Sequence, residues 1–194
     1  MNNKRNRVYI IAGIVLVIIM YIIVTYNGFV KKQEDVNNKW NEVNNAYQRR
    51  SDLIPTLVNT VKGLANFEKN IFTDIAAARA KAKAAATDVV NANNITTQLA
   101  AQNELAAATN KLLITVESYP NLKGTTAFTS LQVQLEGTER RVKVARKDFN
   151  QVVADYNSNV KAFPAKIVAS IFGFTPKDGF SAESGAEKII EIKF

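Results

Sequence analysis

The sequence contains no cysteine and no histidine. The lack of cysteine excludes disulfide bonds and lipid attachment at an N-terminal cysteine. Without either residue type the usual zinc sites are excluded, and no imidazole can act as a general base near neutral pH. Glycine-rich phosphate loops and the G-x-S-x-G turn of hydrolases are also missing. Any catalysis would have to use carboxylates, lysine or tyrosine, so we expect neither an enzyme nor a bound cofactor or metal.

Charged residues are absent from one long stretch, Val8 to Val30. As a helix rising about 1.5 Å per residue, this stretch would cover the roughly 30 Å hydrocarbon core of a bilayer. A buried helix of a soluble domain is rarely apolar on all sides over this length, and a cleaved signal peptide has a shorter apolar region that ends in small residues. Here the stretch ends in YNGF. We therefore expect a short basic tail at residues 1–7 and a retained transmembrane helix at residues 8–30.

The positive charge of the chain is spread out rather than clustered. The net charge is +8, and three cations lie in the N-terminal tail, where they favour a cytoplasmic tail and an exported domain. Further cations follow the apolar stretch closely and argue the other way, but long domains are translocated largely regardless of charge. We expect the soluble part on the extracytoplasmic side, with no nucleic-acid partner, because dispersed basic residues are typical of a solvated surface.

Residues 31–163 show the periodicity of long helices. Val36, Trp40, Val43 and Tyr47 recur at intervals of 4, 3 and 4 residues, which places them on one helical face. The pattern continues from Pro55 to Asp88, and Ser51 or Asp52 could cap a new helix there. Residues 31–88 therefore form either one kinked helix or two helices, and both alternatives stay open.

Two more helices follow. An Asn-rich turn at residues 91–94 precedes a helix from about Ile95 to Ser118, with Leu99, Leu105, Leu112, Leu113 and Val116 as its apolar positions. The last helix begins at Thr125 or Thr126 and ends before Pro164. Its apolar stripe comprises Phe128, Leu131, Leu135, Val142, Ala145, Phe149, Val152, Tyr156, Val160 and Phe163. The fold class predicted is all-α: a transmembrane helix followed by an elongated antiparallel bundle of three to four long helices, with coiled-coil-like packing.

The C-terminal segment, residues 164–194, changes character and is expected to be mostly irregular. Residues 165–172 could form two apolar turns. The large apolar side chains of this segment are Ile167, Ile171, Phe172, Phe174 and Phe180. We expect these side chains to dock on the end of the bundle; the alternative is a second patch that contacts the membrane or a partner.

The residues described so far resemble the LemA family of bacterial membrane proteins. The resemblance rests on the stretch RRSDLIPTLVNTVKG and on residues near both ends of the chain. The signature positions are Trp40, Arg49, Arg50, Asp52, Pro55, Gly63, Tyr156, Asn157, Phe163, Pro164, Phe172, Gly173 and Phe174. Among these, Arg49, Arg50 and Asp52 form a dense charged cluster, for which we expect capping and intrahelical pairing rather than contact with a phosphate or a lipid headgroup.

The resemblance implies a single-pass protein with an elongated helical bundle and no established catalytic activity. We therefore expect a non-enzymatic protein of the bacterial cytoplasmic membrane that self-associates or scaffolds partners. Its expected partners are the lipid bilayer, further copies of itself and another membrane protein. The alternative is an adaptor that presents clients to a membrane enzyme such as a protease.

Overall fold

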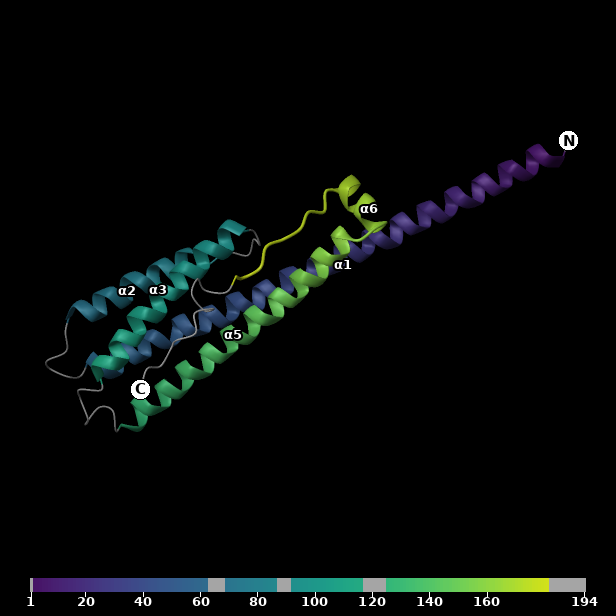
Figure 1. The fold of residues 1–194 in the computed structure, drawn as a ribbon. Helices are drawn as coiled ribbons and strands as arrows, with labels where there is room; N and C mark the ends of the chain where they lie inside the picture. Colours follow the sequence, from purple (N-terminus) through teal and green to yellow (C-terminus); the bar gives the residue numbers. More distant parts are fainter. Residues whose placement is uncertain (1, 63–68, 87–91, 117–124, 182–194) are drawn as a thin grey trace, which may run out of the picture.

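The fold is built from helices alone over the residues that the computed structural model describes, 2–62, 69–86, 92–116 and 125–181. In chain order the helices are α1 (Asn2–Lys62), α2 (Lys69–Ala84), α3 (Ala92–Val116), α5 (Thr126–Lys161) and α6 (Ala165–Phe172). Figure 1 shows an elongated bundle from which the N-terminal part of α1 projects alone. The all-α prediction is confirmed.

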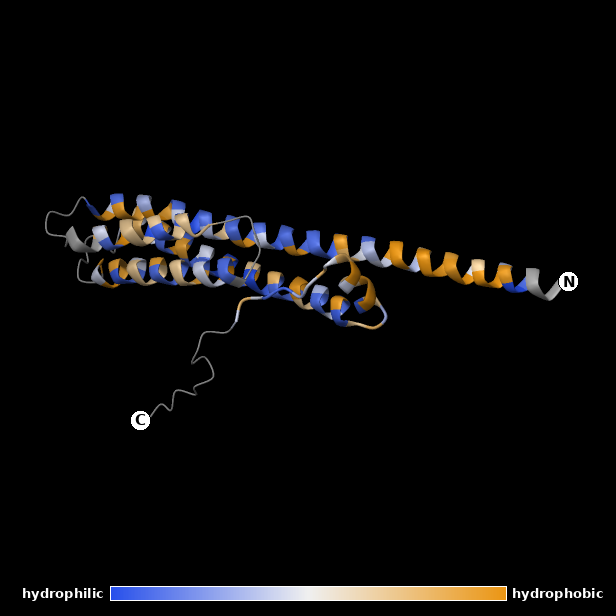
Figure 2. Ribbon diagram, turned by 90° about the horizontal axis from the view of Figure 1, so that it is seen from above, coloured by the Kyte–Doolittle hydropathy of each residue, from blue (hydrophilic) through white to orange (hydrophobic). Residues whose placement is uncertain are grey.

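Helix α1 runs without interruption from the apolar stretch into the bundle. It has 61 residues, with Pro55 inside it, and it contains a segment long and apolar enough to cross a membrane, none of which is buried against the rest of the chain. Figure 2 shows this segment as the continuous hydrophobic part of α1. The helix continues through Pro55 because Ile54 and Leu57 on either side are buried, and their packing compensates for the missing backbone donor.

The expected helix from Pro55 to Asp88 is wrong. Residues up to Lys62 belong to α1, and a separate helix, α2, begins at Lys69 and ends at Ala84. The capping role expected for Ser51 or Asp52 is wrong for the same reason, since no helix begins there. The turn expected at 91–94 is wrong in part, because Asn93 and Asn94 lie in the first turn of α3.

Helix α5 lies antiparallel to α1 along most of its length, while α2 and α3 form an antiparallel pair beside them (Figure 1). Thr125 caps α5 by accepting a hydrogen bond from the backbone N–H of Phe128. The predicted stripe of α5 is buried except at two positions. Val153 is buried in place of Val152, and Phe163 lies beyond the end of the helix and is exposed.

The bundle has two hydrophobic cores in series along its length. The core nearer the apolar segment, which we call the near core, includes Phe29, Val36, Trp40, Phe149 and Tyr156. The far core includes Ile54, Leu57, Leu105, Leu112 and Leu135. All four residues of the predicted face from Val36 to Tyr47 are buried, so this part of the sequence pattern is confirmed.

An extended segment after α6, residues 174–181, runs back along the bundle as a strap (Figure 1). Two asparagines of α5 hold it. The Asn150 side chain accepts from Phe180 N–H at 2.8 Å and donates to Phe180 O at 2.9 Å; Asn157 makes the same pair with Lys177, at 2.8 and 2.7 Å. Phe180 then stacks on Trp40, with ring centroids 6.0 Å apart.

The expected docking of the C-terminal aromatic and aliphatic side chains is right for Phe174 and Phe180, wrong for Ile167 and Ile171, and right in part for Phe172, whose ring contacts Tyr26 of α1. Phe174 and Phe180 are half-buried against the near core. Ile167, Ile171 and Phe172 are exposed, because the buried face of α6 consists of Val168 and Ala169 instead. Residues 182–194 lie outside the described part of the chain.

We predict that Gly179→Ala loosens the strap. A Cβ at this position would come 2.7 Å from Asn150 Oδ1, so the amide would have to leave Phe180. The loss of two hydrogen bonds lowers the free energy of unfolding by about 1–3 kcal/mol. Thermal and urea unfolding followed by the fluorescence of Trp40, the only tryptophan, measures the change.

Gly137→Ala is the matched control, since nothing lies within 4 Å of its Cβ position inside α5. We expect this variant to be more stable than the wild type by about 0.5–1 kcal/mol, because alanine replaces glycine in a helix. Equal stability of the Gly179→Ala variant and the wild type would contradict the role given to the strap.

Candidate functional site

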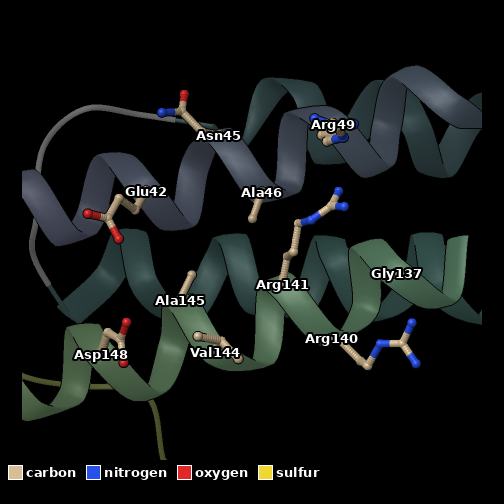
Figure 3. Close-up of a pocket in the computed structure, with 10 residues that line it drawn as sticks. All are labelled: Glu42, Asn45, Ala46, Arg49, Gly137, Arg140, Arg141, Val144, Ala145 and Asp148. Atoms are coloured by element: carbon tan, nitrogen blue, oxygen red, sulfur yellow. The ribbon is translucent and has the colours of Figure 1, made fainter. Parts of the chain in front are cut away.

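A groove lies between α1 and α5, on the side of this helix pair that faces away from α2 and α3 (Figure 3). Its volume is about 590 Å³. Small residues make the hollow: Ala46 on α1 lies across from Ala145 on α5, and Gly137 lies farther along α5, on the side of Arg49 (Figure 3). The full set of lining residues is Glu42, Asn45, Ala46, Arg49, Gly137, Arg140, Arg141, Val144, Ala145 and Asp148.

The charges of the groove are segregated along its length. Arg49, Arg140 and Arg141 lie at the end farther from the apolar segment, and Glu42 and Asp148 lie at the nearer end (Figure 3). The two ends are about 10 Å apart, since seven helical residues separate Glu42 from Arg49. Such a groove can bind an elongated partner that places acidic groups beside the arginines and basic groups beside the two carboxylates.

A polar belt separates the two hydrophobic cores at the level of this groove. Three helices contribute buried polar residues there: Arg50 from α1, Gln98 and Gln102 from α3, and Thr138 from α5. Gln98 donates to Asn44 Oδ1 at 2.6 Å, which ties α3 to α1.

Arg50 is the charged member of the belt. Its side chain is 7% exposed and forms an ion pair with Glu139 of α5, whose side chain is 53% exposed. Burial lowers the pKa of Arg50, and the nearby guanidinium of Arg146 acts in the same direction. Arginine nevertheless stays protonated at neutral pH, so this is an ion pair with one buried and one solvated end.

Tyr47 and Arg146 form a second link between α1 and α5. Arg146 Nε donates to the Tyr47 hydroxyl at 2.7 Å, and the guanidinium lies over the rings of Tyr47 and Phe180, at 5.4 and 5.2 Å from their centroids. Burial raises the pKa of Tyr47, while Arg146 opposes this shift. The hydroxyl is therefore neutral near pH 7, and Arg146 connects Tyr47 of α1 to Phe180 of the strap.

The charged cluster of the signature does not act as expected. The expected intrahelical pairing of Arg49, Arg50 and Asp52 is wrong: Arg50 and Asp52 pair with other helices, and among the described residues no ion pair joins Arg49 to Asp52. Arg49 lines the groove, Arg50 pairs with α5, and Asp52 lies 4.0 Å from Arg79 of α2. Arg79 Nε also donates to Ser51 O at 3.0 Å. The cluster joins α1 to two other helices.

Most of the remaining signature residues lie in or beside the near core. Trp40 and Tyr156 are buried in it, and Asn157 holds the strap. Gly173 ends α6 in the left-handed conformation, with φ of 75°, and Phe174 packs on Phe29. Pro55 lies within α1, Phe163 and Pro164 form the exposed turn before α6, and Phe172 contacts Tyr26. Gly63 lies outside the described residues.

Several residues of the site were missed by sequence reasoning. No sequence pattern identifies Glu139, Arg146 or Gln98, because their partners are distant in the chain. Asn150 could have been found, since it lies seven residues before the signature residue Asn157 on the same helix. A spacing of seven returns to nearly the same face of a helix, and both asparagines adjoin residues of the predicted stripe.

The described residues contain no group of three or more acidic residues, histidines or cysteines that could hold a metal ion. The groove presents guanidinium groups and carboxylates on stable helices. Its chemistry is that of recognition through charge and shape.

We predict that Glu139→Gln destabilises the bundle by about 1–3 kcal/mol, because a buried guanidinium loses its counter-charge. Introducing Arg50→Met into this variant should restore much of the loss, since no unpaired charge is then buried. Urea unfolding of the single and double variants measures this coupling. Glu136→Gln, an exposed change on the same helix, is the control and should alter stability by less than about 0.5 kcal/mol. Simple addition of the two losses would contradict the pairing.

Comparison with known proteins gives a consistent result. A family model described as the LemA family matches residues 39–194. The magnetosome proteins MamQ 1 and MamQ 2 of Paramagnetospirillum magneticum (strain ATCC 700264 / AMB-1) are each 23% identical over 192 residues, covering 89% of this chain and 71% of the relative. The matched region contains the groove, the polar belt, α6 and the strap, and the resemblance inferred from the signature residues is confirmed: the chain belongs to the LemA family.

Proposed function

We propose that this protein is a single-pass, non-enzymatic scaffold of the bacterial cytoplasmic membrane, with its bundle on the extracytoplasmic side. The observation that carries the proposal is the continuity of α1, which passes from the apolar segment into both hydrophobic cores without a loop. A domain on a flexible linker would be merely tethered. This bundle instead has a defined orientation relative to its membrane segment.

The dimensions suit a rigid spacer. Residues 31–62 of α1 would extend about 48 Å beyond the bilayer at 1.5 Å per residue. Helix α5 packs antiparallel beside α1 and stiffens it. The groove with Arg49 and Glu42 is therefore held at a set height above the membrane surface.

The charge pattern of the groove favours a different protein over a second copy as its occupant. Two copies in one membrane, related by a two-fold axis along the membrane normal, have their α1 helices parallel. Arg140 and Arg141 would then lie at the same height as their counterparts, and like charges would oppose one another. A partner segment with acidic groups at that height, and basic groups at the height of Asp148, avoids this repulsion.

Self-association through the membrane segment is a second candidate. The most apolar part of α1 is not buried by the rest of the chain, so most of its surface is available to lipid or to a second copy. A partner that is itself a membrane enzyme, such as a protease, would make the protein an adaptor. Membership of the LemA family and the likeness to magnetosome proteins support the association with a membrane on which both candidates rest.

Charge reversal in the groove tests the scaffold. We predict that Arg140→Glu with Arg141→Glu abolishes recovery of a stoichiometric protein partner with the full-length chain in mild detergent. Lys143→Glu with Lys147→Glu is the matched control, because these exposed residues of α5 do not line the groove and the change in net charge is the same. Equal recovery with both variants, or no partner with the wild type, would contradict the proposal.

The side of the membrane is tested with single cysteines, because the chain has none of its own. We predict that Val133→Cys, at an exposed position of α5 outside the groove, reacts in cells with a permeable outer membrane and an intact inner membrane when a maleimide that cannot cross the latter is added. A cysteine in the N-terminal tail, at Asn3, should react only after lysis. The reverse pattern would place the bundle in the cytoplasm.

A further inference from the structure

Helix α6 exposes large apolar side chains although it also packs against the bundle. Val168 and Ala169 are buried, whereas Phe163 is 84% exposed, Ile171 67% and Ile167 54%. Ile167 and Ile171 are one turn apart and therefore lie on the same face. A cluster of exposed large apolar residues is the kind of surface that marks an interaction site.

The position of α6 along the molecule identifies what this surface meets. The ring of Phe172 lies 4.9 Å from that of Tyr26 in the apolar segment of α1, and Phe174 lies 5.6 Å from Tyr26 and 5.1 Å from Phe29. Ile22 also packs against the near core. In Figure 2 the hydrophobic colour of α6 adjoins that of α1 where α1 leaves the bundle.

The length of the apolar segment determines the depth of this contact. A helix crossing a 30 Å hydrocarbon core needs about 20 residues, and the apolar segment begins after Arg7. The hydrocarbon core then reaches to about residue 27, and further if the helix is tilted. Ile22 and Tyr26 therefore lie within the last turns of the membrane segment, and α6, which packs against them, lies at the same depth.

The charges near α6 are those of an interfacial element. Lys31 follows the apolar segment, Lys161 ends α5 and Lys166 lies on α6, and all three are exposed. Cations beside an apolar face favour the boundary between anionic headgroups and acyl chains.

We propose that α6 and the preceding Phe163 form a second membrane contact, which inserts into the headgroup and acyl boundary beside the transmembrane segment. The occupant of the exposed face of α6 is lipid. This inference rests on the membrane anchoring proposed above, and it adds that the chain meets the bilayer at two points.

Labelled single-cysteine variants of the full chain in phosphatidylcholine and phosphatidylglycerol nanodiscs test the contact. Ile167→Cys and Ile171→Cys carry an environment-sensitive fluorophore. We expect blue-shifted emission, strong quenching by nitroxide-labelled lipid and weak quenching by aqueous iodide. Val144→Cys is the matched control, since Val144 is 56% exposed and lies on the bundle away from α6; it should respond to iodide only.

Three other results would overturn the inference or its basis. If the α6 labels behave like the label at Val144, the face meets water. If they are shielded from both quenchers, protein covers them. A label at Leu16→Cys, within the apolar segment, separates failure of α6 from failure of the anchor: quenching by lipid at Leu16 alone removes only the second contact, whereas no quenching at Leu16 removes the membrane anchoring itself.

Discussion

A single helix that belongs both to the apolar segment and to the core of the bundle is the constraint on which the rest of this structure depends. Ile22, Phe29 and Val36 follow one another at intervals of seven residues, and the buried face then continues through Trp40 to Val61 in steps of 3 and 4. This spacing keeps one face of α1 turned toward the same side. The surface that receives α5 in the bundle therefore continues into the apolar segment, where α6 occupies it after the chain turns at Pro164.

The polar belt determines how α1 and α5 are aligned along their length. Hydrophobic stripes alone could pair in more than one way, because leucine and valine positions recur every turn. A shift of α5 by one turn, about 5.4 Å, would bury Arg50 away from Glu139 and separate Tyr47 from Arg146. An unpaired buried charge costs far more than a repacked aliphatic side chain, so the belt favours one alignment of α1 and α5. The groove depends on that alignment, since its hollow lies where Ala46 of α1 is across from Ala145 of α5.

The fold could be predicted where apolar residues alone occupy the buried face. On α5 the stripe failed at Val152, because the steps from Phe149 to Tyr156 fit either Val152 or Val153 and only the packing of neighbouring segments decides. On α3 the buried face includes Gln98, Gln102 and Thr109, while Leu99 is only half-buried. A pattern of apolar residues therefore predicts the wrong buried face for this helix. The site was less predictable still: partners such as Arg50 and Glu139, or Asn150 and Phe180, meet only because distant elements cross.

The position of the groove relative to the membrane depends on its height along α1 and on the tilt of this helix. A lone transmembrane helix tilts by about 20° on average, and the far end of α1, about 48 Å above the bilayer, would then move sideways by about 16 Å. The scaffold proposed above would have to limit this motion in order to present its groove at a set position. Contact of α6 with the lipid surface would resist tilting in the direction that lifts α6 out of the membrane. The strap carries this restraint into the bundle, because Asn157 and Asn150 attach the chain that leaves α6 to the same helix that forms one wall of the groove.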